Sequence, residues 1–219
     1  MKKIKEFIIK EWVWIIGFIC LIGFLLLAED VFNKEIMQGD IIGYKLVSYL
    51  LISDAITPIV KVISNFGSAT FLITLTVILI IAIKNRKIGI SILCNLVIIT
   101  GFNLLLKHIL QRPRPTEYRI IDETGYSFPS GHSMISMAFY GYLVYLIYKN
   151  IKNKYIKWGL IVVLSILICS IGISRIYLGV HYTSDVLAGF MISIFYLILY
   201  IKIFERINSV KSTNTSKIK

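Results

Sequence analysis

The sequence predicts an all-α, polytopic membrane protein with six transmembrane helices and one extracytoplasmic interfacial helix. Its 219 residues are 57% hydrophobic, with a mean hydropathy of +0.77, whereas soluble domains are about 45–50% apolar. Six runs without a charged side chain each come close to the roughly 17–25 residues that a helix needs to cross the hydrocarbon core. These runs are residues 12–28, 66–83, 88–106, 131–148, 158–174 and 186–201.

The positive charge, +12 at pH 7, is sorted between the two sides of the predicted membrane. If the N-terminus, the 84–87 turn, the 149–157 loop and the tail from Lys202 share one side, that side holds 16 Lys and Arg against 3 Asp and Glu. The other side holds 8 against 9. Cytoplasmic loops are enriched in Lys and Arg. We therefore expect a plasma-membrane protein with both termini in the cytoplasm, and no nucleic acid partner.

The segment 41–64 is ambiguous, because it is apolar yet carries Asp54, Thr57, Pro58 and Lys61 at helical spacing. A seventh span is the alternative. However, a central Asp or Lys costs about 2.5–3.5 kcal/mol on insertion, and a seventh crossing would reverse the side of every later loop. We expect a helix that lies on, or dips into, the outer surface.

The chain is predicted to form one membrane domain over residues 1–207. The tail 208–219 is rich in Ser, Thr, Asn and Lys and is predicted to be disordered. The three cysteines fall inside predicted spans and are interpreted as small apolar residues. The sequence gives no prediction of the oligomeric state.

The longest polar segment, residues 107–129, leaves the third predicted span and contains two Arg-Pro pairs, which exclude a regular helix. Lys107 stands at the end of that span and Arg114 seven residues later, so the loop can fold both cations toward one dianionic group. Arg offers a planar fork for two phosphate oxygens, while Lys supplies a mobile point charge. The alternative is an ordinary cation beside lipid headgroups, which is our interpretation of Arg112.

The segment Pro129-Ser130-Gly131-His132 stands immediately before the fourth predicted span. Ser130 can cap that helix, and a helix start with outward-facing amides binds anions. Gly131 lets a phosphate approach the backbone, and His132 places beside it an imidazole that can donate a proton. A capped helix that begins with a histidine explains the segment about as well.

The third segment ends the fifth predicted span at Ser174 and Arg175 and continues to His181 and Asp185. The i, i+4 spacing of His181 and Asp185 predicts that they share a helix face. A carboxylate on one ring nitrogen sets the tautomer and leaves the other nitrogen as a nucleophile. The alternative is that His181 and Asp185 form a purely structural pair. However, a charged Asp at the end of a membrane span is disfavoured unless it has a functional role.

Together the three segments read Lys, six residues, Arg-Pro; then Pro-Ser-Gly-His; then Ser-Arg, five residues, His, three residues, Asp. This pattern closely resembles the membrane-bound phosphatidic acid phosphatase type 2 family. With the six-span layout the resemblance covers most of the chain, although the first 60 residues add little to it. The resemblance implies a lipid phosphate phosphatase, and since the sequence offers no metal-ligand cluster, we expect no metal and no other cofactor.

The resemblance also implies a role for each motif residue. His181 would attack phosphorus and become a transient phosphohistidine, Asp185 would orient it, and His132 would protonate the departing oxygen. Because phosphoryl transfer depends mainly on positioning and electrostatic stabilisation, three cations can replace a metal. The residues that would hold the non-bridging oxygens are Lys107, Arg114, Ser130, Gly131 and Arg175.

The predicted pocket lies on the outer side at headgroup depth, which favours a phosphate carried on a lipid within the bilayer. Similar small six-span members of the family act on undecaprenyl diphosphate, phosphatidylglycerol phosphate or phosphatidate. We expect the polyprenyl diphosphate first and phosphatidylglycerol phosphate next. Two alternatives stay open: a lipid phosphotransferase that uses the same phosphohistidine, and a non-catalytic phospholipid binder or transporter.

Overall fold

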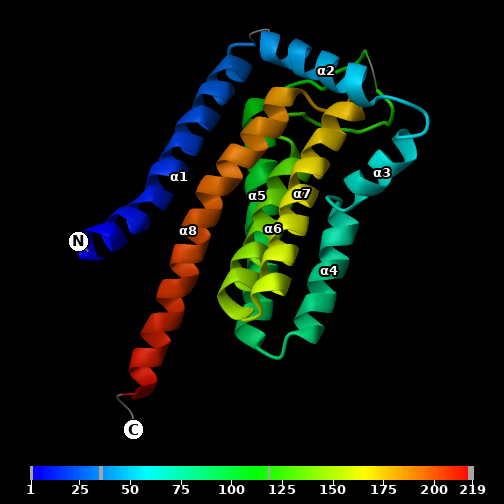
Figure 1. The fold of residues 1–219 in the computed structure, drawn as a ribbon. Coiled ribbons are helices and arrows are strands. Elements are labelled where there is room, and N and C mark those ends of the chain that lie inside the picture. The colour runs from blue at the N-terminus through cyan, green and yellow to red at the C-terminus, as the bar shows by residue number, and fades with distance from the viewer. Residues whose placement is uncertain (1, 35–36, 118, 217–219) are drawn as a thin grey trace.

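The structure, a computed structural model, describes residues 2–34, 37–117 and 119–216, of which 2–11 and 208–216 are described by their backbone alone. This part of the chain is helical with connecting loops, which confirms the predicted all-α fold (Figure 1). In chain order the helices are α1 (Lys2–Phe32), α2 (Gln38–Leu51), α3 (Thr57–Asn65), α4 (Ala69–Ala82), α5 (Arg86–Leu110), α6 (Gly131–Asn150), α7 (Lys154–Tyr177) and α8 (Thr183–Ser216).

Four of the described helices are long and apolar enough to cross a membrane, as a multi-pass protein requires. The pair α3 and α4, bent by 50° at its junction, gives a fifth crossing if it counts as one broken span. The sixth predicted crossing falls on α6, which does not belong to this set, so the count of six stays a prediction. The four stretches are Trp12–Phe32, Arg86–Leu110, Lys154–Tyr177 and Thr183–Ile207.

Helix α6 lies at the centre of the bundle, where it packs against α5, α7 and α8. Its side chains belong to two buried apolar clusters: Phe139 packs with residues of α4, α5 and α7, and Ala138 with residues of α1, α5 and α8. A helix covered by other helices can carry polar side chains if they find partners. Tyr142 does so by donating to Ser91 on α5 at 2.8 Å. This central position accounts for the polar residues in α6.

The segment 41–64, predicted as one interfacial helix, is instead divided between α2 and α3. Pro58 lies in the first turn of α3, where proline is tolerated. The break between the helices is held by Tyr177, whose hydroxyl lies 2.7 Å from the Thr57 hydroxyl and also bonds the backbone of Ser53. In Figure 1, α2 lies across one end of the bundle. Its position at a membrane surface stays a prediction.

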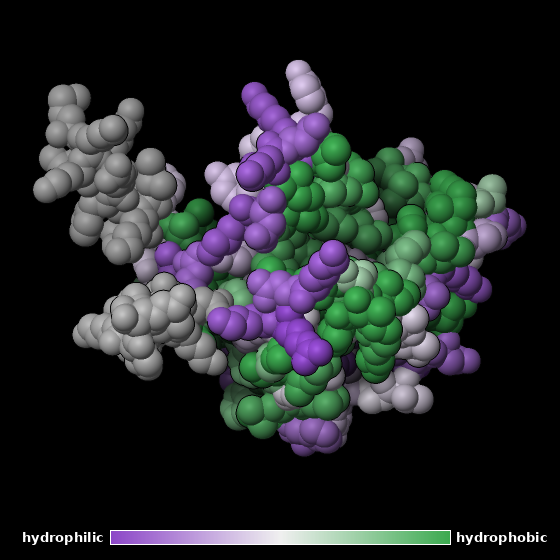
Figure 2. Space-filling view, turned by 90° about the horizontal axis from the view of Figure 1, so that it is seen from below, coloured by the Kyte–Doolittle hydropathy of each residue, from purple (hydrophilic) through white to green (hydrophobic). Residues whose placement is uncertain are grey.

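Four helix ends meet at the end of the bundle that α2 covers, which we call the motif end. They are the C-terminal ends of α5 and α7 and the N-terminal ends of α6 and α8 (Figure 1). Gln111, with a left-handed φ of 45°, ends α5 and turns the chain into the loop 111–130. The short α4–α5 and α6–α7 turns lie at the opposite end, where Figure 2 shows hydrophilic side chains gathered among the apolar surfaces.

Helices α6 and α8 approach each other closely at the motif end. A Cβ on Gly189 would lie 3.1 Å from the Ser130 carbonyl and 3.2 Å from the Met134 amide, both backbone atoms that cannot move aside. Ser193 then donates to the Met134 carbonyl at 2.8 Å. Close packing and interhelical hydrogen bonds are what hold helices together in lipid, so these contacts fix the two helix starts that carry motif residues.

Helix α8 continues to Ser216. The boundary at residue 207 is therefore not marked by a break in the backbone. The disordered tail 208–219 stays a prediction, and residues 217–219 lie outside the described residues.

Candidate active site

The residues that the sequence singles out for chemistry come together at the motif end. They are Lys107 (last turn of α5), Arg114 (loop 111–130), Ser130 (cap of α6), Gly131 and His132 (first turn of α6), Arg175 (last turn of α7), His181 (between α7 and α8) and Asp185 (first turn of α8).

His181 and Asp185 form a buried pair. His181 Nδ1 lies 3.3 Å from Asp185 Oδ2, and the two side chains are 2% and 0% exposed. The same oxygen accepts the Tyr182 backbone N–H at 2.9 Å. The predicted contact is present, but His181 precedes the first residue of α8, Thr183, so a turn rather than a helix face presents its ring. With Nδ1–H donated to the carboxylate, Nε2 keeps its lone pair.

Arg114 faces the other nitrogen of His181. Its Nη1 donates to His181 Nε2 at 3.1 Å and to the Val180 carbonyl at 2.9 Å. Its Nε and Nη2 donate to the carbonyls of Thr124 and Gly125, which hold the guanidinium in place. The cation thus lies beside the lone pair that would attack a phosphoryl group.

The surroundings of His181 keep it neutral at pH 7. Its pKa is lowered from 6.5 to about 4, mainly by burial, because desolvation disfavours the charged ring. Asp185 opposes this shift, whereas Arg114 and Arg175 contribute to it. A neutral imidazole is the form with a lone pair available for nucleophilic attack.

Arg175 and Arg114 share the carboxylate of Glu123. Arg175, only 1% exposed, donates through Nη2 to Glu123 Oε1 at 2.5 Å and through Nη1 to the Ser64 hydroxyl at 2.5 Å. The other oxygen of Glu123 lies 3.6 Å from Arg114 Nη2. Burial raises the pKa of Glu123, but Arg175 and Arg114 outweigh it and hold that pKa below its ordinary value. The two arginines are therefore arranged to hold one anion between them.

Lys107 and Gly131 lie on the α5 side of this cluster. The ammonium group of Lys107 donates to the Tyr126 carbonyl. A Cβ on Gly131 would lie 3.0 Å from Asn103 Oδ1 and 3.9 Å from Lys107 Cε, so the glycine keeps the space beside the helix start narrow but open. Asn103 also donates to the Pro129 carbonyl at 3.2 Å and so fixes the peptide that precedes the cap.

Ser130 caps α6, as predicted: its hydroxyl accepts the Ser133 N–H at 3.4 Å. Its own N–H donates to the Asp185 carbonyl at 3.0 Å, which ties the starts of α6 and α8 together. His132 follows in the first turn and interacts electrostatically with the charges of Arg175 and Arg114 and with His181. The helix start, with its positive dipole end, therefore belongs to the same cationic cluster.

Arg112 is also part of this site, so its interpretation as a headgroup cation is wrong. Its Nη1 lies 2.7 Å from Asp185 Oδ1 and its Nη2 2.7 Å from Asp40 Oδ2, with a side chain that is 12% exposed. Burial lowers its pKa, but Asp185 and Asp40 outweigh burial and raise that pKa above the ordinary value. The sequence carries one sign of this role: Arg112-Pro113 repeats the Arg114-Pro115 pair two residues earlier.

Two acids, Asp40 and Glu123, were not predicted as site residues. Both pair with arginines of the cluster at the motif end. The available signal was the near balance of charge on the predicted outer side, 8 Lys and Arg against 9 Asp and Glu. That balance says that acids accompany the cations, but it does not say which acids pair with which cations.

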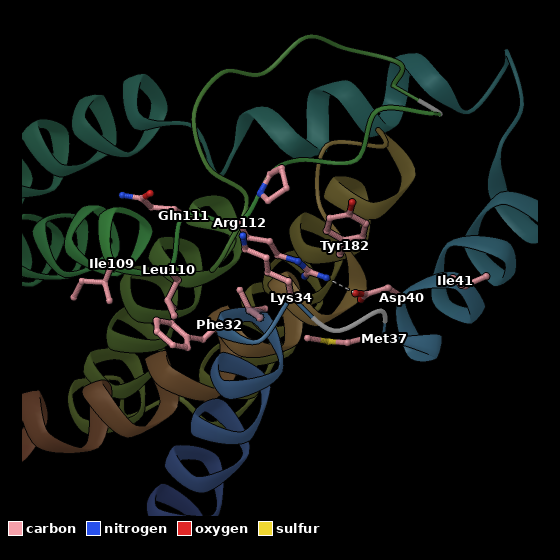
Figure 3. A pocket seen from close by; sticks show the side chains of 12 residues that line it. Phe32, Lys34, Met37, Asp40, Ile41, Ile109, Leu110, Gln111, Arg112 and Tyr182 are labelled. Carbon is pink, nitrogen blue, oxygen red and sulfur yellow. Dashed lines mark hydrogen bonds and ion pairs between the residues drawn. The ribbon is translucent and has the colours of Figure 1, made fainter.

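A cavity of about 740 Å³ lies beside Arg112, between the ends of α1 and α5 and the start of α2. Figure 3 shows Arg112 reaching Asp40 at this cavity, with Tyr182 close by. The Tyr182 ring centroid is 4.0 Å from the guanidinium carbon. The walls combine apolar and polar side chains: Val31, Phe32, Met37, Ile41, Ile109, Leu110 and Pro113 with Lys34, Asp40, Gln111, Arg112 and Tyr182.

The chemistry that this arrangement allows is attack by a neutral imidazole on an anionic ester. A carboxylate lies behind His181, and the guanidinium groups of Arg114 and Arg175 act on it electrostatically. The ammonium group of Lys107 interacts with Asp185 and both arginines, and a second imidazole lies in the first turn of α6. Within the described part of the chain, His, Cys, Asp and Glu side chains do not gather in threes, as a metal site would need.

The sequence matches the PAP2 superfamily over residues 71–209. It is 33% identical over 181 residues to phosphatidylglycerophosphatase B of Bacillus subtilis, which covers 78% of this chain and 86% of that protein. It is 28% identical over 194 residues to undecaprenyl-diphosphatase of Sulfolobus acidocaldarius, which covers 84% of this chain and 86% of that protein.

The fold is similar to a solved structure as well. The crystal structure of a transmembrane PAP2 type phosphatidylglycerolphosphate phosphatase from Bacillus subtilis aligns with a TM-score of 0.78 at 26% identity. The alignment covers 87% of this chain and 96% of that one. The helix arrangement that brings the motif residues together is therefore shared with a membrane phosphatase.

Proposed function

The chain belongs to the PAP2 superfamily, and we propose that it releases phosphate from a lipid-linked phosphate or diphosphate through a phosphohistidine intermediate, without a metal ion. The observation that carries this proposal is the buried His181, whose Nδ1 faces Asp185 while its Nε2 faces Arg114. A neutral imidazole with a carboxylate behind it and a cation in front is suited to attack phosphorus while the cation holds the phosphoryl oxygens.

In the first step His181 Nε2 attacks phosphorus, and the bond from phosphorus to the lipid oxygen breaks. The negative charge of the bound phosphate favours the protonated form of His132. His132 then gives its proton to that departing oxygen, so that the lipid leaves as an alcohol or as a monophosphate. Asp185 stabilises the positive charge that develops on the imidazole of His181.

In the second step a water molecule attacks phosphorus, and the bond from phosphorus to Nε2 breaks. His132, now neutral, takes the proton from that water and returns to its starting form. Inorganic phosphate is released and His181 is regenerated. Through both steps Arg114, Arg175 and Lys107, with the amides at Ser130 and Gly131, balance the charge on the non-bridging oxygens.

We assign the motif end to the extracytoplasmic side. The support is the charge pattern: the opposite end carries the Lys-rich turns 84–87 and 149–157, and Figure 2 shows hydrophilic side chains there among apolar ones. A site at the ends of apolar helices lies at headgroup depth, so a phosphate attached to a lipid reaches it without leaving the bilayer.

The substrate class follows from this location and from the relatives. One relative is named for phosphatidylglycerol phosphate and another for undecaprenyl diphosphate. Both carry a terminal phosphate on a membrane lipid, which is the group that the cationic cluster at the motif end would hold. We propose undecaprenyl diphosphate and phosphatidylglycerol phosphate as the first substrates to test, with phosphatidate third.

The test is phosphate release by the purified full-length protein in detergent with EDTA present, with each of the three lipids. His181→Ala is compared with a matched control, His108→Ala, because His108 is an exposed histidine whose ring meets that of Tyr126 edge to face, outside the proposed machinery. We expect release to survive chelation, to persist in the control and to vanish in His181→Ala. Because the bond from phosphorus to a histidine nitrogen breaks in acid, quenching of phosphate-labelled substrate with alkaline detergent should trap label on His181.

Three other results would change the assignment. Phosphate that appears on an added acceptor lipid instead of in solution would make the protein a phosphotransferase. Release that chelation abolishes would contradict the metal-free mechanism. A folded protein that binds these lipids but releases nothing would be a binder rather than a phosphatase.

A further inference from the structure

A chain of buried ion pairs links α2 to the pair formed by His181 and Asp185. The guanidinium of Arg112 lies between two carboxylates, 2.7 Å from Asp40 Oδ2 and 2.7 Å from Asp185 Oδ1. The side chains of Asp40 and Asp185 are 6% and 0% exposed. Figure 3 shows the ion pair between Arg112 and Asp40. Buried charges persist only when they are paired and hydrogen-bonded, and here each one is.

Asp40 also holds the beginning of α8. Its Oδ1 accepts the Ser184 backbone N–H at 2.7 Å, and its Oδ2 accepts the Ser184 hydroxyl at 2.9 Å. The Ser184 oxygen in turn accepts Arg112 Nη1 at 2.7 Å. A carboxylate at a helix N-terminus is favoured by the free amides there. One acid from α2 therefore fixes both Arg112 and the helix turn that carries Asp185.

The two oxygens of Asp185 have different partners. Oδ1 accepts Arg112 Nη1, while Oδ2 accepts the Tyr182 N–H and faces His181 Nδ1. Because a carboxylate can rotate about its last bond, a partner on one oxygen determines where the other points. The 3.3 Å contact between Oδ2 and Nδ1 is the longest of the three, so it depends most on the others for its alignment.

We propose that Asp40 and Arg112 are positioning residues that fix the Asp185 carboxylate and thereby orient His181 for attack on phosphorus. The inference rests on the proposed function. It extends the working site to α2, which lies outside the 71–209 segment that matches the superfamily.

The first test separates turnover from binding. Asp40→Asn, Arg112→Gln and the double variant are compared with Glu205→Gln, which breaks the exposed Lys149–Glu205 pair at the other end of the bundle. Loss of an outer partner of a catalytic group typically costs about 10–100-fold. We expect kcat to fall by about that factor with KM within about twofold. The double variant should lose much less than the product of the two single losses.

The second test is the pH profile of kcat/KM. Arg112→Gln removes the cation beside Asp185, so the carboxylate holds a proton on His181 more strongly and the acid limb should move to higher pH. Loss of packing alone would leave the acid limb in place. The other charged and titratable groups that interact with His181 stay unchanged in this variant: Arg114, Glu123, His132, Arg175 and Asp185 itself. Lys107, which interacts with Asp185 and Arg114, is also unchanged.

The third test uses the cavity of about 740 Å³ that Arg112 lines. In Arg112→Ala a free guanidinium ion can enter from this cavity and take up the position between the two carboxylates. Low guanidinium concentrations, far below denaturing ones, should restore part of kcat, whereas ammonium, which lacks the planar fork, should restore less. His181→Ala should gain nothing from either ion. Arg112→Lys and Asp40→Glu serve where the larger changes fail to fold.

The outcomes are distinct. A kcat loss with KM kept, a non-additive double variant, an upward shift of the acid limb in Arg112→Gln and rescue by guanidinium would support the inference. Folded variants that keep the wild-type kcat, whether or not their KM rises, would overturn the inference. If the wild-type protein itself releases no phosphate from any of the lipids, the proposed function has failed; if the wild type is active and Arg112→Gln matches it, only the positioning role has failed.

Discussion

Ion pairs occur at both ends of the bundle, but the arginines at the motif end are shielded from water, whereas the lysine at the opposite end is exposed. At the motif end Arg175 pairs with Glu123 at 2.5 Å, with a guanidinium side chain that is 2% exposed. At the opposite end Lys149 pairs with Glu205 at 3.0 Å, with side chains that are 52% and 38% exposed. Exposed pairs contribute about 0–1 kcal/mol to stability, whereas removal of one partner from a buried pair costs about 3–5 kcal/mol.

This difference in exposure indicates that the charges at the two ends have different roles. The exposed Lys and Arg residues act through their number and side, which suits the orientation of a membrane protein. The buried ones act through geometry in a medium where Coulomb interactions are strong. Equivalent substitutions at the two ends should therefore have very different effects on activity.

The sharpest comparison changes one acid to its amide at each end. Asp185→Asn should reduce kcat by about 10⁴-fold, because the amide no longer selects the tautomer that leaves His181 Nε2 free. Glu205→Gln should leave kcat unchanged, since it lies far from the site. Steady-state phosphate release by both variants checks this, with the folded fraction of each monitored by size-exclusion chromatography. Equal losses in the two variants would contradict the comparison.

His132→Ala should reduce kcat by about 10²–10⁴-fold on a lipid phosphate, whose alkoxide leaving group needs a proton. With p-nitrophenyl phosphate, whose leaving group is stable as an anion, the loss in the first step should be much smaller. The measurement is the ratio of burst rates for the two substrates in wild type and variant. A ratio that the substitution leaves unchanged would remove His132 from the role of general acid.

Arg175→Gln should lower kcat/KM by about 10²–10³-fold, the usual cost of one preorganised donor to a charged transition state. Lys149→Gln, which removes a cation from the exposed pair, should have no measurable effect. The comparison is made with inorganic phosphate as a competitive inhibitor, whose Ki should rise in Arg175→Gln only. An unchanged Ki would place Arg175 outside the phosphate site.

The pH dependence reports the burial of His181. Attack requires the neutral ring, whose pKa is lowered from 6.5 to about 4. Activity limited by this group is therefore present above that pH and is lost as the pH falls through it. Measured with p-nitrophenyl phosphate, the acid limb of kcat/KM should lie well below 6.5. An acid limb at the value of an ordinary histidine would show that water reaches the ring.

The smallest effect is expected for the exposed pair. A double-mutant cycle of Lys149→Gln and Glu205→Gln should give a coupling free energy of about 1 kcal/mol or less, reduced further by salt. Thermal unfolding in detergent at low and high ionic strength measures it. A coupling of several kcal/mol would mean that this end is as shielded from water as the motif end.

Much of the fold could be predicted because lipid imposes simple rules on sequence. The uncharged runs 88–106 and 158–174 place α5 and α7 within about four residues of their observed bounds. The runs 12–28 and 186–201 lie inside α1 and α8, but α1 begins 10 residues earlier and α8 ends 15 residues later. The division of 41–64 into α2 and α3 could not be predicted, because the break is held by the hydroxyl of Tyr177, more than a hundred residues away. The helix propensity of residues 41–64 contains no information about this tertiary contact.

The candidate site shows the same limit. Its motif residues sit at helix ends on one predicted side, so their meeting could be expected from topology alone. Arg112 could not be separated from an ordinary headgroup cation, since its partners Asp40 and Asp185 become neighbours only when α2 crosses the bundle end. Glu123 is likewise assigned by the path of the loop 111–130, which has no regular secondary structure to predict.

Arg175 has one further atom that bears on the whole molecule. Its Nε–H is buried and has no acceptor among the described residues, and a buried donor without a partner costs about 1–3 kcal/mol. A phosphoryl oxygen within reach of Nε would give this donor an acceptor. Folding and ligand binding are then linked: phosphate should raise the Tm of the wild type and leave that of Arg175→Gln nearly unchanged.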